Sequence, residues 1–228
     1  MSLTQEQQQL PDLLLNSLSV SSLACPGSGK TYMAVEGIEQ VFKSPNNPYK
    51  NCLIMYFNKK NAVEASSKFA KKGISSSLVQ CSTSHSLAFR FAKPEIQQRI
   101  IDTSSNGILP FKTASIRNHF KKAQPMLARK YMAKHMSKGA WWAKIILDRF
   151  HMTTDPVPTF DHMLDTETGT MEWNAMKRHD GSNLVKEVSV LMASEFHDFM
   201  MGDDSQAPHT FGLNLRNFVL SEPDLGFD

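Results

Sequence analysis

Residues 24–31 read Ala-Cys-Pro-Gly-Ser-Gly-Lys-Thr, and this stretch decides the fold. It follows the phosphate-loop pattern G-x-x-x-x-G-K-[ST], except that Ala24 replaces the first glycine. The two remaining glycines free the backbone to turn successive N–H groups inward, while Lys30 supplies a cation and Thr31 a hydroxyl. The octet therefore predicts a site for the phosphates of a nucleotide, and a Gly/Ser-rich surface turn is the alternative.

The flanks of the octet fit this prediction. Residues 18–23, Leu-Ser-Val-Ser-Ser-Leu, predict a short buried strand. Residues 31–42 predict a helix because apolar residues recur at helical spacing, at Met33, Ile38, Val41 and Phe42. A strand, a glycine-rich loop and a helix in this order are the context that a phosphate loop requires.

The next part of the chain alternates predicted strands and helices. Apolar residues predict strands over 51–57 and 78–82, and the segment 61–72 between them predicts a helix that ends at Gly73. Alternating strands and helices imply parallel pairing through crossover connections. Residues 1–92 are therefore expected to begin an α/β domain.

The remainder of the chain is expected to hold a helical insertion. Residues 93–160 read as mostly helical and end at a segment with two prolines, which interrupts a helix. Residues 161–228 are expected to return to the α/β domain. Within them, 182–195 have the apolar spacing of a helix, 199–201 predict a short strand, and the last residues show no clear element.

Composition and cysteine usage bound the class of protein. The 228 residues are 41% hydrophobic and 21% charged, as in one large or two small globular domains. No apolar run approaches the roughly 18 residues of a membrane span. The start of the chain lacks the basic residues of an export signal. Three widely spaced cysteines, Cys25, Cys52 and Cys81, indicate reduced thiols in an intracellular protein, nuclear in a eukaryote and cytoplasmic in a bacterium or virus.

Positive charge is concentrated in residues 93–151. This segment has twelve Lys or Arg against three Asp or Glu, a balance of +9, although the whole chain carries only +3. Aromatic residues are interleaved with the basic ones, and Trp141 and Trp142 lie between Lys138 and Lys144. Such a pattern is typical of a face that binds a polyanion and equally of a solvated helical surface.

Five short motifs together resemble those in the first RecA-like domain of UvrD/Rep-like superfamily 1 DNA helicases, with the F-box DNA helicase branch the most similar. The motifs are Leu3–Gln7, Ala24–Thr31, Tyr56–Ala62, Thr83–Ala88 and Gly202–Phe211. The resemblance implies an α/β fold, a RecA-like P-loop NTPase parallel sheet with an inserted mostly helical subdomain. It implies an ATP-dependent DNA helicase or ATPase of DNA repair or recombination, with ATP and Mg²⁺ as cofactors. Residues 1–92 and 161–228 would form the RecA-like domain, and 93–160 the insertion.

The first two motifs would hold the nucleotide. By the resemblance, the Gln7 amide reads the adenine edge, Lys30 contacts the β- and γ-phosphates, and Thr31 binds Mg²⁺. For Gln7 a simple polar tract is the alternative. The complete predicted ATP-binding set is Gln7, Ala24, Cys25, Pro26, Gly27, Ser28, Gly29, Lys30 and Thr31.

The next two motifs would contact single-stranded DNA or a duplex junction. The resemblance implies that Phe57 offers a face on which a base stacks, while Asn58 and Lys59 contact phosphates. Thr83 and His85 would touch the DNA backbone or bases. The alternative for the first of these motifs is a strand end followed by a polar helix start.

The last motif would connect the two ligands. By the resemblance, Gln206 senses the γ-phosphate and completes the catalytic set with Lys30 and Thr31. His209 stands where the family has a base-stacking tyrosine, and it is expected to contact DNA.

The chain departs from the family at the catalytic carboxylates. The family places Asp-Glu-x-x-Asp at the end of an apolar strand, whereas residues 171–180 contain no such strand and only Asp180 matches, as the last acid. Acids within 162–167 and 194–198 have the wrong spacing. Gly212 replaces an expected arginine, and a second motor domain that brings further arginines is expected to be missing. Translocation is therefore not expected of this chain alone.

Three functions remain open at this point. The first is an ATP- and DNA-binding helicase-family protein, a fragment or one part of a motor that needs a second motor domain or partner protein. The second is a regulatory ATP/DNA-binding module that does not hydrolyse ATP. The third is a P-loop small-molecule kinase in which residues 93–160 act as a lid.

Overall fold

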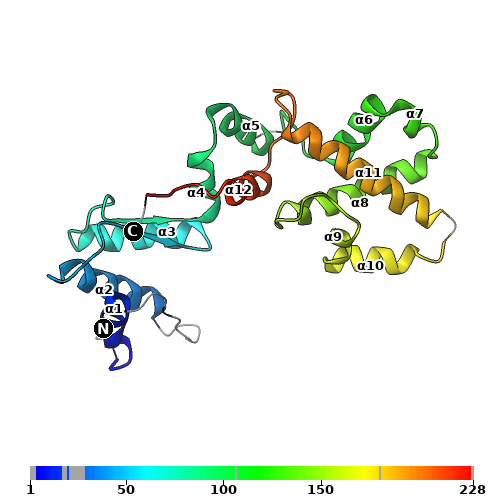
Figure 1. Cartoon of the computed structure of the whole chain (residues 1–228). Helices are drawn as coiled ribbons and strands as arrows, with labels where there is room; N and C mark the ends of the chain where they lie inside the picture. Colours follow the sequence, from blue (N-terminus) through cyan, green and yellow to red (C-terminus); the bar gives the residue numbers. More distant parts are fainter. Residues whose placement is uncertain (1–3, 17–19, 21–28, 106, 180, 227–228) are drawn as a thin grey trace. The chain divides into compact units, whose positions relative to one another are not determined.

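The computed structural model describes residues 4–16, 20, 29–105, 107–179 and 181–226. They form two compact units, Met1–Leu87 with Asp224–Asp228, and Ala88–Pro223. Figure 1 shows the order of the elements along the chain. Among the described helices, none is both long and apolar enough to cross a membrane.

The first unit contains the phosphate-loop helix and a small sheet. Its elements are η1 (Gln7–Gln9), α1 (Leu10–Asn16), α2 (Lys30–Lys43), β1 (Cys52–Met55), α3 (Lys59–Lys71) and β2 (Val79–Ser82), followed by α4 (Ser84–Phe91), which continues into the second unit. The helices predicted over 31–42 and 61–72 and the strands predicted over 51–57 and 78–82 are confirmed. The strand predicted over 18–23 falls outside the described residues.

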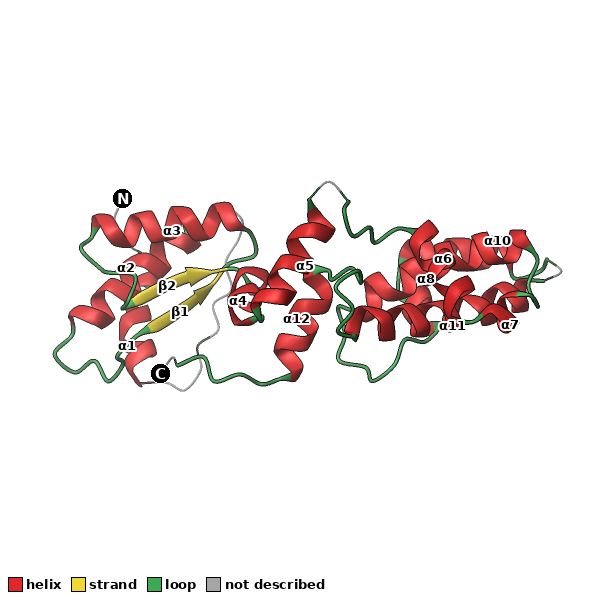
Figure 2. Ribbon diagram, turned by 90° about the horizontal axis from the view of Figure 1, so that it is seen from above, coloured by secondary structure: helices red, strands yellow, loops and turns green. Residues whose placement is uncertain are grey.

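The strands β1 and β2 pair in parallel, as the sequence predicts. Their register runs from Cys52 opposite Val79 to Met55 opposite Ser82, and α3 is the crossover between them. Figure 2 shows the two arrows side by side and pointing the same way. A small hydrophobic core packs the helices against this sheet. It consists of Val35, Phe69, Ile74 and Val79 with half-buried neighbours.

Two glycines mark the ends of helices in this unit. Gly29 precedes α2 with φ +79°, and Gly73 follows α3 with φ +76°. Side chains other than glycine rarely adopt this left-handed conformation, so both positions require glycine. The glycine of the phosphate loop and the predicted helix stop are therefore both explained by backbone geometry.

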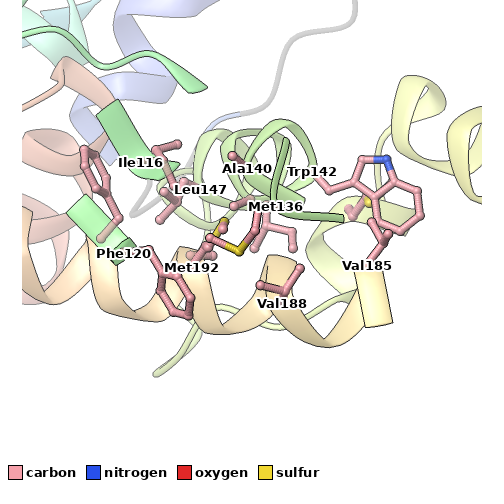
Figure 3. Packing of buried hydrophobic residues seen from close by; sticks show 14 of the residues in the cluster. Ile116, Phe120, Met136, Ala140, Trp142, Leu147, Val185, Val188 and Met192 are labelled. Atoms are coloured by element: carbon pink, nitrogen blue, oxygen red, sulfur yellow. The ribbon is translucent and has the colours of Figure 1, made fainter. Parts of the chain in front are cut away.

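The second unit contains helices and no strand among its described residues. Its elements after α4 are α5 (Pro94–Ser104), α6 (Thr113–Ala123), α7 (Pro125–Ala128), α8 (Ala133–Phe150), α9 (Asp161–Leu164), α10 (Glu167–Met176), α11 (Ser182–Met201) and α12 (Phe211–Leu220). The long helices α8 and α11 pack against each other and share one hydrophobic core. Figure 3 shows Met136 and Trp142 from α8 in this cluster with Val185 and Val188 from α11.

Three predictions for the last third of the chain are wrong. The run 199–201 is the end of α11 rather than a strand, because Met200 continues the helical face that packs into the core and is 0% exposed. The residues after 210 form α12, whose Leu213 is fully buried. Residues 161–179 and 181–226 contain no strand, so the expected return to α/β structure does not occur there.

Candidate nucleotide and nucleic-acid site

The carboxyl ends of β1 and β2 bring two of the predicted DNA motifs to one edge of the sheet. The backbone N–H of Tyr56 donates to the carbonyl oxygen of Ser82 at 2.8 Å, one residue beyond the Met55–Ser82 pair. Residues that follow β1 therefore lie beside residues that follow β2. Ligands of open parallel sheets bind at this edge, so the geometry marks a candidate site.

The segment after β1 offers an exposed ring and a capped helix start. Phe57 is 101% exposed, which leaves both faces of its ring open to a ligand. The side chain of Asn58 caps α3, since its Oδ1 accepts the N–H of Asn61 at 2.8 Å. Lys59 is the first residue of that helix and is exposed.

The segment after β2 starts a second helix in the same way. Thr83 is buried, and its Oγ1 accepts the N–H of Ser86 at 3.2 Å and donates to the Ser86 hydroxyl at 2.9 Å. His85 lies exposed in the first turn of α4. Two helix N-termini thus begin directly after the two strands, and their partial positive charge favours an anion such as a phosphodiester.

The nucleotide motif is described from Gly29 onward. Lys30 begins α2 and is exposed, and Thr31 follows it half-buried. Residues 24–28 of the predicted ATP-binding set fall outside the described residues. Gln7 lies in η1, where its Oε1 accepts the N–H of Thr4 at 3.0 Å, so this oxygen already has a local partner.

An ion cluster ties the nucleotide-motif helix to the end of α3. Lys72 contacts Glu36 at 2.7 Å and also Glu39, which in turn pairs with Lys43. The two lysines lower the pKa of Glu39, and Glu36 and Glu39 raise the pKa of Lys72. Sequence reasoning missed this cluster, although Glu39 and Lys43 stand at the i,i+4 spacing of a helical ion pair.

The two predicted residues of the last motif belong to the second unit. Gln206 is exposed, and its N–H donates to Asp204 Oδ1 at 2.8 Å. His209 is only 2% exposed, and its N–H donates to Thr103 Oγ1 at 2.9 Å. Burial, with a contribution from Arg99, lowers the pKa of His209 to about 4. A base cannot stack on a ring so covered, so the expected DNA contact of His209 does not fit this conformation.

A comparison with models of known protein families identifies the family of the chain. The model of the UvrD/REP helicase N-terminal domain matches residues 3–176. The chain belongs to the UvrD/REP helicase family. No curated protein and no solved structure matches it. The family has a RecA-like fold, and the parallel β1–β2 pair between helices is consistent with one part of that fold.

Two acids of this UvrD/REP family member near the expected carboxylate motif contact other side chains. Residues 171–176 lie in α10 rather than at a strand end, and Glu172 pairs with Lys138 of α8. Glu195 accepts from Gln124 at 2.8 Å. Asp180 falls outside the described residues. Among the described residues no group of three or more His, Cys, Asp or Glu could hold a metal ion.

The basic segment, residues 93–151, contains both exposed cations without a described ion pair and cations that form ion pairs or other contacts. Seven of its cations are exposed and form no ion pair with a described carboxylate: Lys93, Lys112, Lys121, Lys122, Arg129, Lys130 and Lys134. Trp142 is fully buried, and Trp141 is half-buried with the Lys138 ammonium 4.5 Å from its ring centroid. The positive charge is thus available to a polyanion, whereas the expected interleaved aromatic platform is mostly core.

Proposed function

We propose that this UvrD/REP family chain binds ATP and Mg²⁺ at residues 24–31 and single-stranded DNA at the carboxyl edge of the β1–β2 sheet. We further propose that it is a component of an ATP-dependent DNA helicase of the F-box DNA helicase branch. The observation that carries the proposal is the pairing of β1 with β2, because Phe57 and His85 follow the neighbouring ends of these two strands. Two motifs separated in the sequence would then follow one nucleic-acid strand.

The nucleotide part of the proposal rests on the start of α2. Gly29 has the left-handed backbone that a phosphate loop uses, and the helix N-terminus behind it favours phosphate oxygens. Lys30 would contact the β- and γ-phosphates, and the Thr31 hydroxyl would bind Mg²⁺. When bound, Mg²⁺ neutralises charge on the phosphate oxygens. Gln206 would sense the γ-phosphate.

The DNA part of the proposal rests on contacts that bind a single strand regardless of its base sequence. A base has a π-face that stacks on an aromatic ring, and Phe57 offers such a ring in full exposure. Lys59 and the N-termini of α3 and α4 would hold phosphates. The exposed cations of the second unit would contribute further phosphate contacts, which hold a nucleic acid regardless of its sequence.

A second candidate is a regulatory module that binds ATP and DNA without hydrolysis. The observation in its favour is the commitment of Glu172 and Glu195 to contacts with Lys138 and Gln124. Hydrolysis would then depend on carboxylates from outside the described residues, and on arginines from a second motor domain or a partner protein.

Calorimetry with ATP and Mg²⁺, and fluorescence anisotropy with a labelled single-stranded oligonucleotide, test the proposal. Both ligands are expected to bind, and Lys30→Ala is expected to abolish ATP binding while the fold is kept. Lys71→Ala is the matched control, because Lys71 is an exposed lysine in the last turn of α3. A wild type that binds neither ligand contradicts the proposal. DNA-stimulated phosphate release by this chain would rule out the second candidate, since a regulatory module would not hydrolyse ATP.

A further inference from the structure

A buried arginine of α5 makes three hydrogen bonds to the backbone around Gln206. Arg99 is 7% exposed, and its Nε, Nη1 and Nη2 donate to the carbonyl oxygens of Ala207, Gly202 and Met200 at 3.0, 2.9 and 2.7 Å. The planar guanidinium is suited to such a fork of acceptors, and lysine is not. All three nitrogens of this guanidinium are therefore used by backbone on both sides of Gln206.

Two of these bonds cap a helix from another part of the chain. Met200 lies in the last turn of α11, and Gly202 follows the end of that helix. Carbonyl groups at a helix C-terminus lack partners within the helix and carry partial negative charge. The Arg99 guanidinium donates hydrogen bonds to these carbonyl groups and offsets their negative charge. Arg99 of α5 therefore caps the C-terminus of α11, where the Gln206 loop begins.

A second side chain of α5 holds the far end of the same loop. Thr103 lies one helical turn after Arg99, accepts the N–H of His209 at 2.9 Å and donates to the Arg99 carbonyl at 2.7 Å. Four hydrogen bonds from one face of α5 thus bracket residues 200–209. Between them the tip is a defined turn, in which Asp204 accepts the N–H groups of Gln206 and Ala207.

We infer that Arg99 is a positioning residue that fixes the conformation of the loop that carries Gln206, the residue proposed to sense the γ-phosphate. This inference rests on the proposed function, in which Gln206 links nucleotide binding to DNA binding. Arg99 acts through the loop, because each of its three guanidinium nitrogens donates to a backbone carbonyl oxygen there. Its loss therefore leaves the two binding affinities in place and removes the effect of one ligand on the other.

Hydrogen exchange of the loop amides tests the positional part without any ligand. In Arg99→Lys and Arg99→Met the amides of Ala207 and His209 are expected to exchange at least about tenfold faster. A rate change of this size corresponds to the loss of one hydrogen bond to a charged group. Thr103→Val is expected to accelerate His209 in the same way, and it keeps the test decisive if Arg99→Met does not fold. Gln98→Ala, an exposed neighbour on α5, is the matched control with unchanged exchange.

DNA affinity with and without ATP and Mg²⁺ tests the functional part. Arg99→Lys is expected to bind each ligand alone within about threefold of wild type, a small fraction of one charged hydrogen bond, and to lose the change in DNA affinity that ATP causes. Wild-type exchange in the loop of Arg99→Lys, or a retained ATP effect in that variant, overturns the inference. A wild type that binds neither ATP nor DNA contradicts the proposed function instead, and the exchange comparison still decides whether Arg99 fixes the loop.

Discussion

Tyr56 and Ser82 are joined by a backbone hydrogen bond of 2.8 Å where the two parallel strands end. The bond fixes the position from which the chain leaves β1 relative to the position from which it leaves β2. Phe57 and Thr83 are the next residues along the chain after this pair, and they belong to the two predicted DNA motifs. A strand of nucleic acid that contacts one motif would therefore meet the other within the same sheet edge.

Replacing the exposed ring is expected to weaken DNA binding without affecting the fold. Phe57→Ala removes a stacking surface that is worth about 1–3 kcal/mol per base, so the affinity for a single-stranded oligonucleotide should fall about 5- to 160-fold. Fluorescence anisotropy measures the affinity, and urea unfolding checks stability. Val63→Ala is the control, because Val63 is an exposed apolar residue of α3. Equal affinities of wild type and Phe57→Ala would remove Phe57 from the site.

Breaking the ion cluster between α2 and α3 is expected to destabilise the first unit. Lys72→Met leaves Glu36 and the largely buried Glu39 without their shared partner, at a cost of about 1–3 kcal/mol in the free energy of unfolding. Urea denaturation followed by circular dichroism measures the loss. Lys71→Met changes the adjacent exposed lysine and should have little effect. A similar stability of both variants would show that the cluster adds nothing.

Stability is expected to fall with acidification because of a buried histidine. Burial, together with His197 and Arg216, lowers the pKa of His151 to about 3, whereas an unfolded histidine titrates near 6.5. The folded state keeps this ring neutral, so the unfolded state binds the extra proton first. The contribution of His151 is complete above about pH 6.5 and is lost as the pH falls toward 3, by at most about 1.4 kcal/mol per pH unit.

Urea unfolding at several pH values between 7.5 and 4.5 measures this dependence. His151→Phe keeps a flat ring beside Phe150 and His197, and removes the titrating group. Its unfolding free energy should change less steeply with pH than that of wild type. Parallel pH profiles for the two proteins would contradict the assignment, because other groups would then account for the acid sensitivity.

Removing exposed cations of the second unit is expected to flatten the salt dependence of DNA binding. Each phosphate contact contributes about −0.7 to the slope of log affinity against log salt for a single strand. Lys121→Ala with Lys122→Ala should therefore reduce the slope by up to about 1.4 if both lysines contact phosphates. Titrations at several salt concentrations measure it. Lys144→Ala is the control, since Lys144 is paired with Asp148 at 2.6 Å. An unchanged slope would exclude this face from DNA binding.

The sequence predicts the first unit well because its signals are local. The helix after Gly29 follows from apolar spacing, and the stop at Gly73 follows from a backbone conformation that glycine alone adopts readily. The parallel pairing of β1 and β2 follows from the helix between them. The placement of Phe57 and Thr83 just after the two strands was predictable for the same reason, since motif order and strand order coincide.

The second unit was harder to predict because distant contacts decide it. A short apolar run such as 199–201 suits a strand or a buried helix end equally, and packing of Met200 in the core selects the helix. The burial of His209 depends on Arg99 and Thr103, which precede it by about a hundred residues. The sequence around His209 gives no sign of those distant partners. The burial of the His209 side chain could therefore not be inferred from the sequence.

The bonds from Arg99 to Met200 and Ala207 join positions 101 and 108 residues apart. These bonds hold together the two ends of the chain segment that runs from α6 to α11. Changes of length inside this segment would leave the geometry of its two ends intact, since the loop-closure cost grows only slowly with added residues. A foreign domain inserted into a surface loop of this segment is therefore expected to leave that geometry unchanged.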